Sequence, residues 1–343
     1  MSDKEMVVLD GSEGEGGGQI LRTSLSLSMA TGKPFRIGRI RARRSKPGLM
    51  RQHLTAVQAS AKICSAAVEG DTIGSMELTF RPGVVKPGEY SFSVGTAGST
   101  TLVFQTLMPA LILAGKPFAL DLEGGTHNSA SPCLDFLERV YLPCLRQMGV
   151  ESRVKTERRG FYPAGGGRWR VEVTPPKNLL RLEILDRGEF HSLRGKVLWA
   201  KIPDSVPARE SAFLKARLNL KDEDLVIEEA DDSIGPGNVV LAEIRYENIS
   251  EIVTAFGEYG ISSEAVINTV VKESREYQKS GAPVGTHLAD QLLLPMALGA
   301  GGKFRTMPLT LHSRTNIETI GKFLSRPIET HAMEGKIVEI RIP

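Results

Sequence analysis

Apolar helical runs followed by short extended segments recur three times along the chain. Each run begins after a polar stretch; the three segments read GGGQILRTSLSLSMATGKPF, GSTTLVFQTLMPALILAGKPF and HLADQLLLPMALGAGGKF. The pattern predicts three helices, each ending at a glycine suited to a left-handed C-cap, namely Gly32, Gly115 and Gly299. Because the junctions TGKPF, AGKPF and GGKF are versions of one sequence, we interpret the segments as copies of one structural unit.

A second helix and two closing strands complete each predicted unit. The second helices are predicted within RSKPGLMRQHLTAVQASAKIC, THNSASPCLDFLERVYLPCLRQMG and HSRTNIETIGKFL. The last strands are predicted within MELTFRPG, RWRVEVTP and KIVEIRIP, where apolar and polar residues alternate as in a half-buried strand. The predicted fold class is therefore α+β, with three β-α-β-α-β-β repeats packed around a pseudo-threefold axis.

Residues 186–278 interrupt this pattern. They contain LRGKVLWAKIP, typical of a strand, ARESAFLKARLNL, typical of a helix, and NVVLAEIRYENISEIVTAFG, typical of two strands, before a closing helix in SSEAVINTVVKESREYQ. We predict a small α/β domain inserted in the third repeat, over residues 186–278. Residues 1–185 and 279–343 then form a large catalytic domain of three repeats.

Composition places limits on function. The 343 residues include 43 Lys and Arg against 40 Asp and Glu, a net charge of +3, so a nucleic-acid surface would have to be a local patch. Cys64, Cys133 and Cys144 form no CxxC pair, which argues against structural zinc and disulfides. No apolar run reaches membrane-spanning length, and the first residues lack a signal-peptide core. We expect an intracellular, cytoplasmic protein, or a nuclear one in a eukaryotic source.

The opening loop LDGSEGEGGGQILR combines glycines with carboxylates. It is not a Walker A motif, because no Lys-Ser/Thr follows the glycines, and it departs from G-x-G-x-x-G. A divalent cation, Mg²⁺ or Mn²⁺, bridging Glu15 to a phosphate would explain the mixture, with Gln19 and Arg22 beside it. On the residues alone, a solvated carboxylate at the start of a helix explains Glu15 equally well.

Residues 39–53 form a basic segment, RIRARRSKPGLMRQH, without interleaved aromatic residues. If RIRARR is a strand, alternate arginines share one face and Arg44 turns to the other. Arginine binds phosphate through paired hydrogen bonds, so this face is a candidate phosphate site, with Arg41 on it. The alternative is an edge strand protected by charge. Gln52 and His53, at the start of the next helix, favour the phosphate interpretation.

His312, in PLTLHSRTNIETI, stands where a strand runs into a helix. A neutral imidazole there can attack phosphorus, and the helix terminus and Arg314 should lower its pKa. The alternative is a histidine that satisfies a backbone group. His127 and His287 precede helices and could line the same cleft. No histidine pair has HxxxH or HExxH spacing, and G-x-S-x-G is absent, which argues against a histidine zinc centre and a serine hydrolase.

Taken together, DGSEGEGGGQILR, RARRSKPGLMRQH, GTAGSTTLVFQTLMPAL, GFYPAGGG, HLADQLLLPMAL and LHSRTN resemble the RNA 3′-terminal phosphate cyclases over essentially the whole chain. In that family each repeat resembles the C-terminal domain of a translation initiation factor, and a smaller domain is inserted in the third. The resemblance implies an ATP-dependent enzyme. A histidine takes AMP from ATP, AMP passes to an RNA 3′-phosphate, and the 2′-hydroxyl closes a 2′,3′-cyclic phosphodiester. AMP and pyrophosphate are released.

The resemblance also assigns roles to individual positions. His312 matches the nucleophile and Glu15 a metal ligand. The ATP-binding positions are matched by Gln105, Pro132, His287, Leu288, Ala289, Asp290 and Gln291, with Pro132 against the adenine. The phosphate- and RNA-binding positions are matched by Arg22, Arg41, Arg44, Gln52 and His53, to which we add Gln19. The chain departs from the bacterial pattern at His287, where that pattern has tyrosine stacked on adenine.

Two alternatives remain open at this point. One branch similar to the family is a non-catalytic RNA-binding scaffold of ribosome biogenesis, which lacks the nucleophile; His312 favours the enzyme. Enolpyruvyl transferases are built from repeats of similar topology, and fold analogy alone does not fix function. The expected partners are ATP and RNA 3′-phosphate ends, and no membrane. The sequence leaves the metal, the cellular RNAs, the role of the inserted domain and the oligomeric state open, a homodimer being one option.

Overall fold

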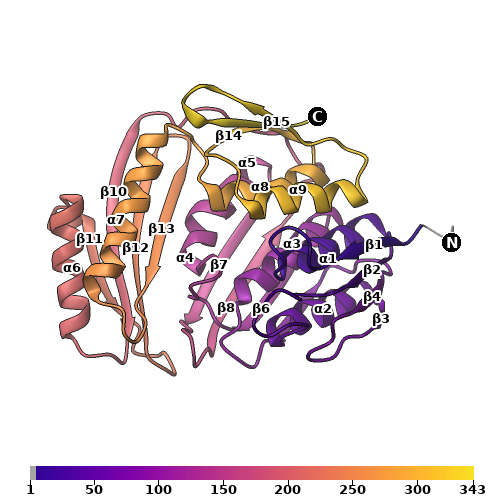
Figure 1. Ribbon diagram of the computed structural model, residues 1–343, viewed down its shortest axis with the longest axis horizontal. Coiled ribbons are helices and arrows are strands. Elements are labelled where there is room, and N and C mark those ends of the chain that lie inside the picture. The colour runs from indigo at the N-terminus through magenta and orange to yellow at the C-terminus, as the bar shows by residue number, and fades with distance from the viewer. Residues whose placement is uncertain (1–4) are drawn as a thin grey trace.

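The computed structural model describes residues 5–343 and shows a mixed α and β fold of small sheets covered by helices (Figure 1). Three of the sheets lie together with their helices, and a fourth lies at one end of the molecule. Within the described range, none of the helices has the length and apolar character of a bilayer-spanning segment.

The first sheet is built from the amino-terminal strands. Its elements are β1 (Val7–Asp10), α1 (Gln19–Thr31), β2 (Phe35–Gly38), α2 (Arg51–Cys64), β3 (Ala67–Glu69) and β4 (Leu78–Arg81). The strand order is β1-β2-β4-β3, with β1 and β2 parallel and the other neighbours antiparallel. Gly32, after α1, has a φ of 69°, which confirms the predicted left-handed cap.

The second sheet repeats this order of strands. Its elements are β5 (Glu89–Ser93), α3 (Thr100–Leu113), β6 (Phe118–Gly124), α4 (Leu134–Phe136), the π-helical turn η1 (Leu137–Tyr141), α5 (Leu142–Gln147), β7 (Glu151–Arg158) and β8 (Gly167–Thr174). The order is β5-β6-β8-β7, and only β5 and β6 are parallel. Gly115 has a φ of 70°, as predicted.

The third sheet joins one mid-chain strand to the carboxyl-terminal elements. These are β9 (Leu182–Ile184), α8 (Thr286–Leu298), β14 (Gly302–Thr306), α9 (Leu311–Phe323), β15 (Glu329–Ala332), the 3₁₀ turn η3 (Glu334–Lys336) and β16 (Val338–Ile342). The order is β9-β14-β16-β15, again with one parallel pair. The predicted left-handed cap at Gly299 is wrong, because its φ is −93° and Gly301, two residues later, makes the left-handed turn with a φ of 73°.

The fourth sheet lies between β9 and α8 in the chain, and we call residues 190–280 the inserted region. Its elements are β10 (Phe190–Ala200), α6 (Ser205–Leu218), the 3₁₀ turn η2 (Asp222–Asp224), β11 (Leu225–Glu229), β12 (Gly237–Tyr246), β13 (Ser250–Phe256) and α7 (Ser263–Ser280). The strand order is β11-β10-β12-β13, and α6 and α7 cover the outer face (Figure 1).

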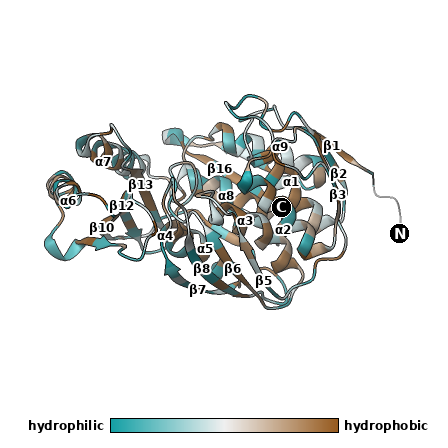
Figure 2. Ribbon diagram, turned by 90° about the horizontal axis from the view of Figure 1, so that it is seen from below, coloured by the Kyte–Doolittle hydropathy of each residue, from teal (hydrophilic) through white to brown (hydrophobic). Residues whose placement is uncertain are grey.

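Both faces of the fourth sheet are apolar. Val197 and Val240 pack toward α6 and α7, whereas the alternating residues Leu198 and Leu241 belong to the main core. The sheet therefore has helices on one side and the rest of the protein on the other, as Figure 2 shows in a second view.

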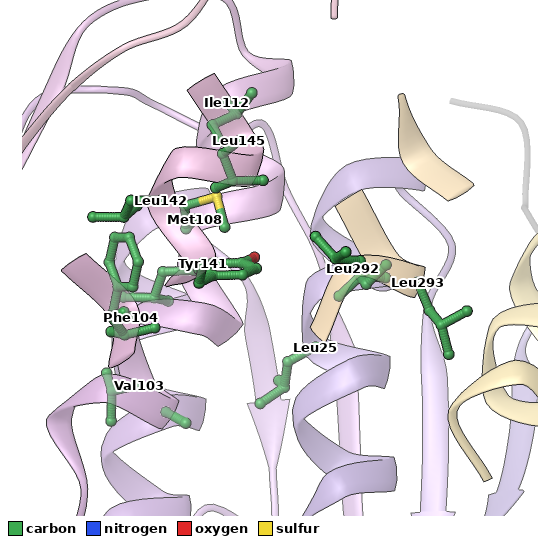
Figure 3. Packing of buried hydrophobic residues seen from close by; sticks show 14 of the residues in the cluster. Leu25, Val103, Phe104, Met108, Ile112, Tyr141, Leu142, Leu145, Leu292 and Leu293 are labelled. Carbon is green, nitrogen blue, oxygen red and sulfur yellow. The ribbon is translucent and has the colours of Figure 1, made fainter. Parts of the chain in front are cut away.

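The main core is formed where helices from all three similar sheets meet. Figure 3 shows Phe104 and Met108 of α3 beside Tyr141, with Leu292 of α8 and Leu25 of α1 nearby. α3 is apolar on nearly all sides because helices and its own sheet surround it. Short side chains on α1 allow close packing between helices; Ser26 Oγ donates to the Thr106 carbonyl of α3 at 2.5 Å.

The predicted arginine strand is wrong. β2 ends at Gly38, and Arg39 and Arg41 both have a φ of 53°, in the left-handed region that strands do not use. The Ala42 N–H donates to the Arg39 carbonyl at 3.2 Å, and the Arg44 N–H to the Arg41 carbonyl at 3.0 Å. The segment therefore forms successive turns, and its arginines point in different directions instead of sharing one strand face.

Candidate active site

The glycine loop before α1 packs against two other helices. A Cβ at Gly14 would overlap the Thr315 hydroxyl of α9, and one at Gly18 would overlap the His53 ring of α2. The Glu15 N–H donates to Thr315 Oγ1 at 3.1 Å, which fixes the loop to α9. Glycine is therefore required here by close packing, and the loop brings the starts of α1, α2 and α9 together.

His312 lies in the first turn of α9, where the Thr310 hydroxyl caps the helix. Its Nδ1 is 3.1 Å from Gln19 Oε1, and its Nε2 is 3.8 Å from Glu15 Oε1. Gln19 directs its amide nitrogen to both carboxylate oxygens of Asp290, at 2.7 and 2.9 Å. Gln19 Oε1 must therefore accept a hydrogen bond from Nδ1–H, which leaves the lone pair on His312 Nε2 available for attack.

Asp290 is the centre of this network. The Asn316 amide donates to its carboxylate at 3.1 Å and to its backbone carbonyl at 2.9 Å, and Thr23 donates to Asn316 Oδ1 at 2.9 Å. Burial raises the pKa of the Asp290 carboxyl, and the surrounding donors and cations oppose that rise. Residues from α1, α8 and α9 thus form one chain of hydrogen bonds that ends at the His312 ring.

The electrostatic environment favours the neutral form of His312. Burial is the largest cause that lowers its pKa, Asp290 opposes it, and Arg22 and Arg44 lower it further. The direction agrees with the sequence prediction, but the cations responsible are these two arginines and not Arg314. His53 has its pKa lowered to about 3 by burial, Arg22 and Arg41, and its Nδ1 accepts the Met50 N–H at 3.3 Å.

The Arg22 guanidinium lies near the Asp290 carboxyl group but forms no ion pair with it. Among residues 5–343 it has no hydrogen bond or ion pair through its side chain, although it is partly buried beside Asp290. Burial lowers its pKa to about 10. A partly buried guanidinium without a partner is costly unless an anion binds it, so this position favours a phosphate ligand.

The other basic side chains have partners within the chain. Arg44 forms an ion pair with Glu15, and Arg41 donates to the Lys46 and Gly48 carbonyls at 2.6 and 2.8 Å. Gln52 accepts the Ser99 N–H at 2.7 Å, which ties α2 to the start of α3. Arg44 lies at the exposed rim of the site, where a phosphate could compete with Glu15 for it.

A cavity of about 80 Å³ lies beside this network. Its lining includes Gln19, Arg22, Gln105, Asp290, Gln291 and Asn316. The Gln105 and Gln291 side chains are hydrogen-bonded to each other across it, from α3 to α8. Five of the predicted site residues, from α1, α3 and α8, thus line one cavity, and the His312 ring of α9 is hydrogen-bonded to one of them, Gln19.

Other predicted positions lie differently. Leu288 and Ala289 have fully buried side chains, so only their backbone could meet a ligand. His287 is exposed on α8 with Glu273 nearby, and the Pro132 carbonyl accepts from Thr101 at 2.7 Å. The prediction that His127 lines the cleft is wrong, because its ring is buried and bonded to Asp135 at 2.9 Å.

Sequence reasoning missed Asn316 and Thr315, which hold Asp290 and the glycine loop. Both follow His312 on α9, and Asn316 is four residues after it, on the same face of the helix. Helical spacing from His312 was therefore the signal that could have identified it.

The donor set fits a divalent cation only in part. Glu15 offers one hard oxygen at the loop. Within the described residues, the group of three side chains with metal-ligand spacing is His127, Cys133 and Asp135, which lies elsewhere. A cation at Glu15 would therefore take its remaining ligands from phosphate and water, as Mg²⁺ commonly does.

The family comparison and the similar curated proteins agree with each other. Residues 13–330 match the family described as RNA 3′-terminal phosphate cyclase. A protein of that name from Koribacter versatilis is 51% identical over 330 residues, 96% of this chain and 93% of its own. One from Salmonella enteritidis is 46% identical over 336 residues, 98% of each chain. A crystal structure of the enolpyruvyl transferase NikO from Streptomyces tendae matches 48% of this chain and 33% of its own, with 16% identity and a TM-score of 0.27.

Proposed function

Because the chain belongs to the RNA 3′-terminal phosphate cyclase family, we propose that it converts an RNA 3′-terminal phosphate into a 2′,3′-cyclic phosphodiester at the expense of ATP. The observation that carries the proposal is the pairing of two features at one cavity. His312 presents a free Nε2 lone pair, and Arg22 presents a guanidinium that has no hydrogen bond or ion pair among residues 5–343. A nucleophile beside an anion site is what nucleotidyl transfer requires.

The proposed first step is attack of His312 Nε2 on the α-phosphorus of ATP. The N–P bond forms as the bond to pyrophosphate breaks, which gives a histidyl-AMP intermediate. An oxygen of the RNA 3′-phosphate then attacks the same phosphorus and releases the imidazole. Finally the 2′-hydroxyl loses its proton and attacks the 3′-phosphorus, closing the ring and expelling AMP. Adenylation thus turns a poor leaving oxygen into part of AMP.

The remaining roles follow from the arrangement of side chains. Gln19 and Asp290 orient the His312 ring, and Arg22 binds phosphate inside the cavity. Gln105, Pro132, His287 and residues 288–291 would hold the nucleoside, while Arg41, Arg44, Gln52 and His53 would face the phosphates and the RNA end. Glu15 would hold Mg²⁺ or Mn²⁺, which neutralises phosphate charge when bound.

We also propose the architecture that this function uses. The three sheets with the same strand order are repeats around a pseudo-threefold axis, formed by residues 1–185 and 279–343, and residues 186–278 are a domain inserted in the third. The shared pairing directions of the three sheets support this assignment. A homodimer stays a prediction.

Self-adenylation without RNA tests the function. The protein is incubated with ATP labelled at the α-phosphate and Mg²⁺, and covalent label is measured on it and on His312→Ala. We expect label on the wild type, with the added mass of one AMP on His312, and none on the variant. Full labelling of the variant would eliminate His312 as the nucleophile. An unlabelled wild type that still binds RNA would instead support a non-catalytic RNA-binding scaffold.

A further inference from the structure

One buried carboxylate of the inserted region reaches the helix that carries Asp290. Glu251, on β13, is 5% exposed, and its Oε2 accepts the Gly285 N–H at 3.1 Å. Gly285 is the N-cap of α8 and has no side chain with which to cap it. Glu251 therefore gives the N–H of the N-cap residue an acceptor from another sheet, as the glutamate of a capping box does within one helix.

The chain that leads into α8 is held on both sides. From the inserted region, Tyr277 Oη donates to the Pro283 carbonyl at 2.8 Å, and Arg187, just before that region in the chain, donates through Nε to the Ala282 carbonyl at 2.7 Å. From the third sheet, Thr306 Oγ1 donates to the Val284 carbonyl at 2.9 Å. These bonds fix the preceding segment, whereas the Glu251 bond acts on the first turn of the helix.

The first turn of α8 is close to the site in the chain. Asp290 is five residues after Gly285, about 7.5 Å along a helix axis. A shift of that turn would move Asp290 against Gln19 and Gln291 against Gln105, which are the contacts that hold the His312 ring and cross the cavity. The position of α8 therefore determines the geometry of the site.

We infer that Glu251 is a positioning residue for the nucleotide site, through which the inserted region fixes the start of α8 and keeps Asp290 and Gln291 aligned with α1 and α3. This rests on the proposed function, because the site it positions is the proposed ATP site. The inserted region thus contributes to ATP binding without touching the ligand.

Glu210 provides a matched control. It is also a buried glutamate of the inserted region, and it accepts from the Asn238 amide at 2.8 and 2.9 Å on the far side from α8. We expect Glu251→Ala to raise the KM for ATP in self-adenylation by about 3- to 10-fold, the size expected from the loss of one helix cap, with little change in kcat. Glu210→Ala should leave this KM unchanged.

Gly285→Ala gives a sharper test. A Cβ at Gly285 would overlap Glu251 Oε2, and its three nearest atoms all belong to the Glu251 side chain. The substitution should therefore raise the KM for ATP in the wild type but add nothing in Glu251→Ala, where that space is free. A general loss of stability would not produce this dependence. If Glu251→Ala does not fold, the same comparison is made in Glu251→Ser, whose short side chain also leaves that space free, and Gly285→Ala alone should still raise the KM.

The dissociation constant of ATP, measured by calorimetry in the His312→Ala background, separates this inference from the proposed function. The same pattern of weakened binding is expected there, although no adenylation occurs. The positioning role would be overturned if Glu251→Ala and Glu210→Ala had the same KM for ATP and the same dissociation constant for ATP. It would also be overturned if Gly285→Ala had the same effect in the wild type and in Glu251→Ala. An unlabelled wild type would contradict the proposed chemistry alone.

Discussion

The hydrogen bond that orients the His312 ring is accepted by an amide, that of Gln19, and not by a carboxylate. Gln19 lies between His312 and Asp290, so the negative charge of Asp290 acts through one intervening side chain. The ring is held in one tautomer while its pKa stays below the ordinary value. A neutral imidazole is the form that can attack phosphorus.

The pH dependence of self-adenylation should report this arrangement. Because burial and the neighbouring arginines lower the pKa of His312, the neutral form persists to lower pH than for an ordinary histidine. The single-turnover rate of adenylation should therefore stay constant as pH falls through about 6.5 and decline only below it. A rate that halves at or above pH 6.5 would contradict the proposed environment.

Gln19→Ala should separate orientation of the ring from the presence of the nucleophile. Without the amide, His312 Nδ1 loses its acceptor, and we expect the adenylation rate to fall on the order of 100-fold, as for a misplaced catalytic group. Ser24→Ala is the control, because Ser24 lies on the same helix and donates only to the Ile20 carbonyl. Equal rates for the two variants would show that Gln19 does not orient the ring.

The sequence indicated the chemistry at single residues better than their contacts. Glu15, Gln19 and His312 were predicted from motifs almost 300 residues apart, and they lie together. Helical spacing from His312 could have identified Asn316 as a site residue, but its contact with Asp290 depends on how α9 faces α8 after folding. The lack of an ion pair at Arg22 within the described residues could not be predicted either, since it is a property of packing and not of local sequence.

At the scale of elements, the arginine segment shows where pattern fails. Alternating arginines suggested a strand face, but positive φ angles at Arg39 and Arg41 turn the chain and place Arg44 beside Glu15. The hydrophobic pattern could not distinguish a strand from turns in this segment, because the segment contains few apolar residues. The apolar helices were predicted correctly, since their buried faces dominate the sequence signal.

This turn gives Arg44 a role different from that of Arg22. Arg44 is exposed at the rim and Arg22 lines the cavity, so RNA phosphate should meet Arg44 while ATP phosphate meets Arg22. We expect Arg44→Ala to lower RNA cyclisation by about 10-fold, the value of one charge-assisted hydrogen bond, and to change self-adenylation less. Arg22→Ala should lower both. Equal losses in the two steps for Arg44→Ala would refute this division.

At the scale of the whole molecule, the fourth sheet is part of the core and not a separate appendage. One of its faces packs on its own helices and the other on the body, and Lys196 joins Asp135 at 3.1 Å across that contact. The sequence predicted the strands and helices of this region, but it did not predict that the second face of the sheet packs on the body of the protein. Apolar residues at successive strand positions indicate that both faces are buried, but not which element covers each face.

Buried carboxylates in the inserted region should make the stability of the protein depend on pH. Burial raises the pKa of Glu210 to about 7, from the 4.5 of an ordinary glutamate, so the folded state holds a proton there that the unfolded chain loses. Between pH 4.5 and 7 the folded state binds more protons, and stability from this group therefore falls as pH rises.

Glu210→Gln removes the titration and keeps the shape. At pH 5 the variant and the wild type should have similar free energies of unfolding, because both side chains are neutral. At pH 8 the variant should be more stable than the wild type, by on the order of 2 kcal/mol. In the folded wild type at this pH, Glu210 must either be buried as a carboxylate or stay protonated above its pKa, and both cost free energy. Denaturant unfolding at the two pH values measures the difference. A difference that does not grow with pH would show that Glu210 is ionised in the fold, and that the amide of Asn238 alone compensates for burying its charge.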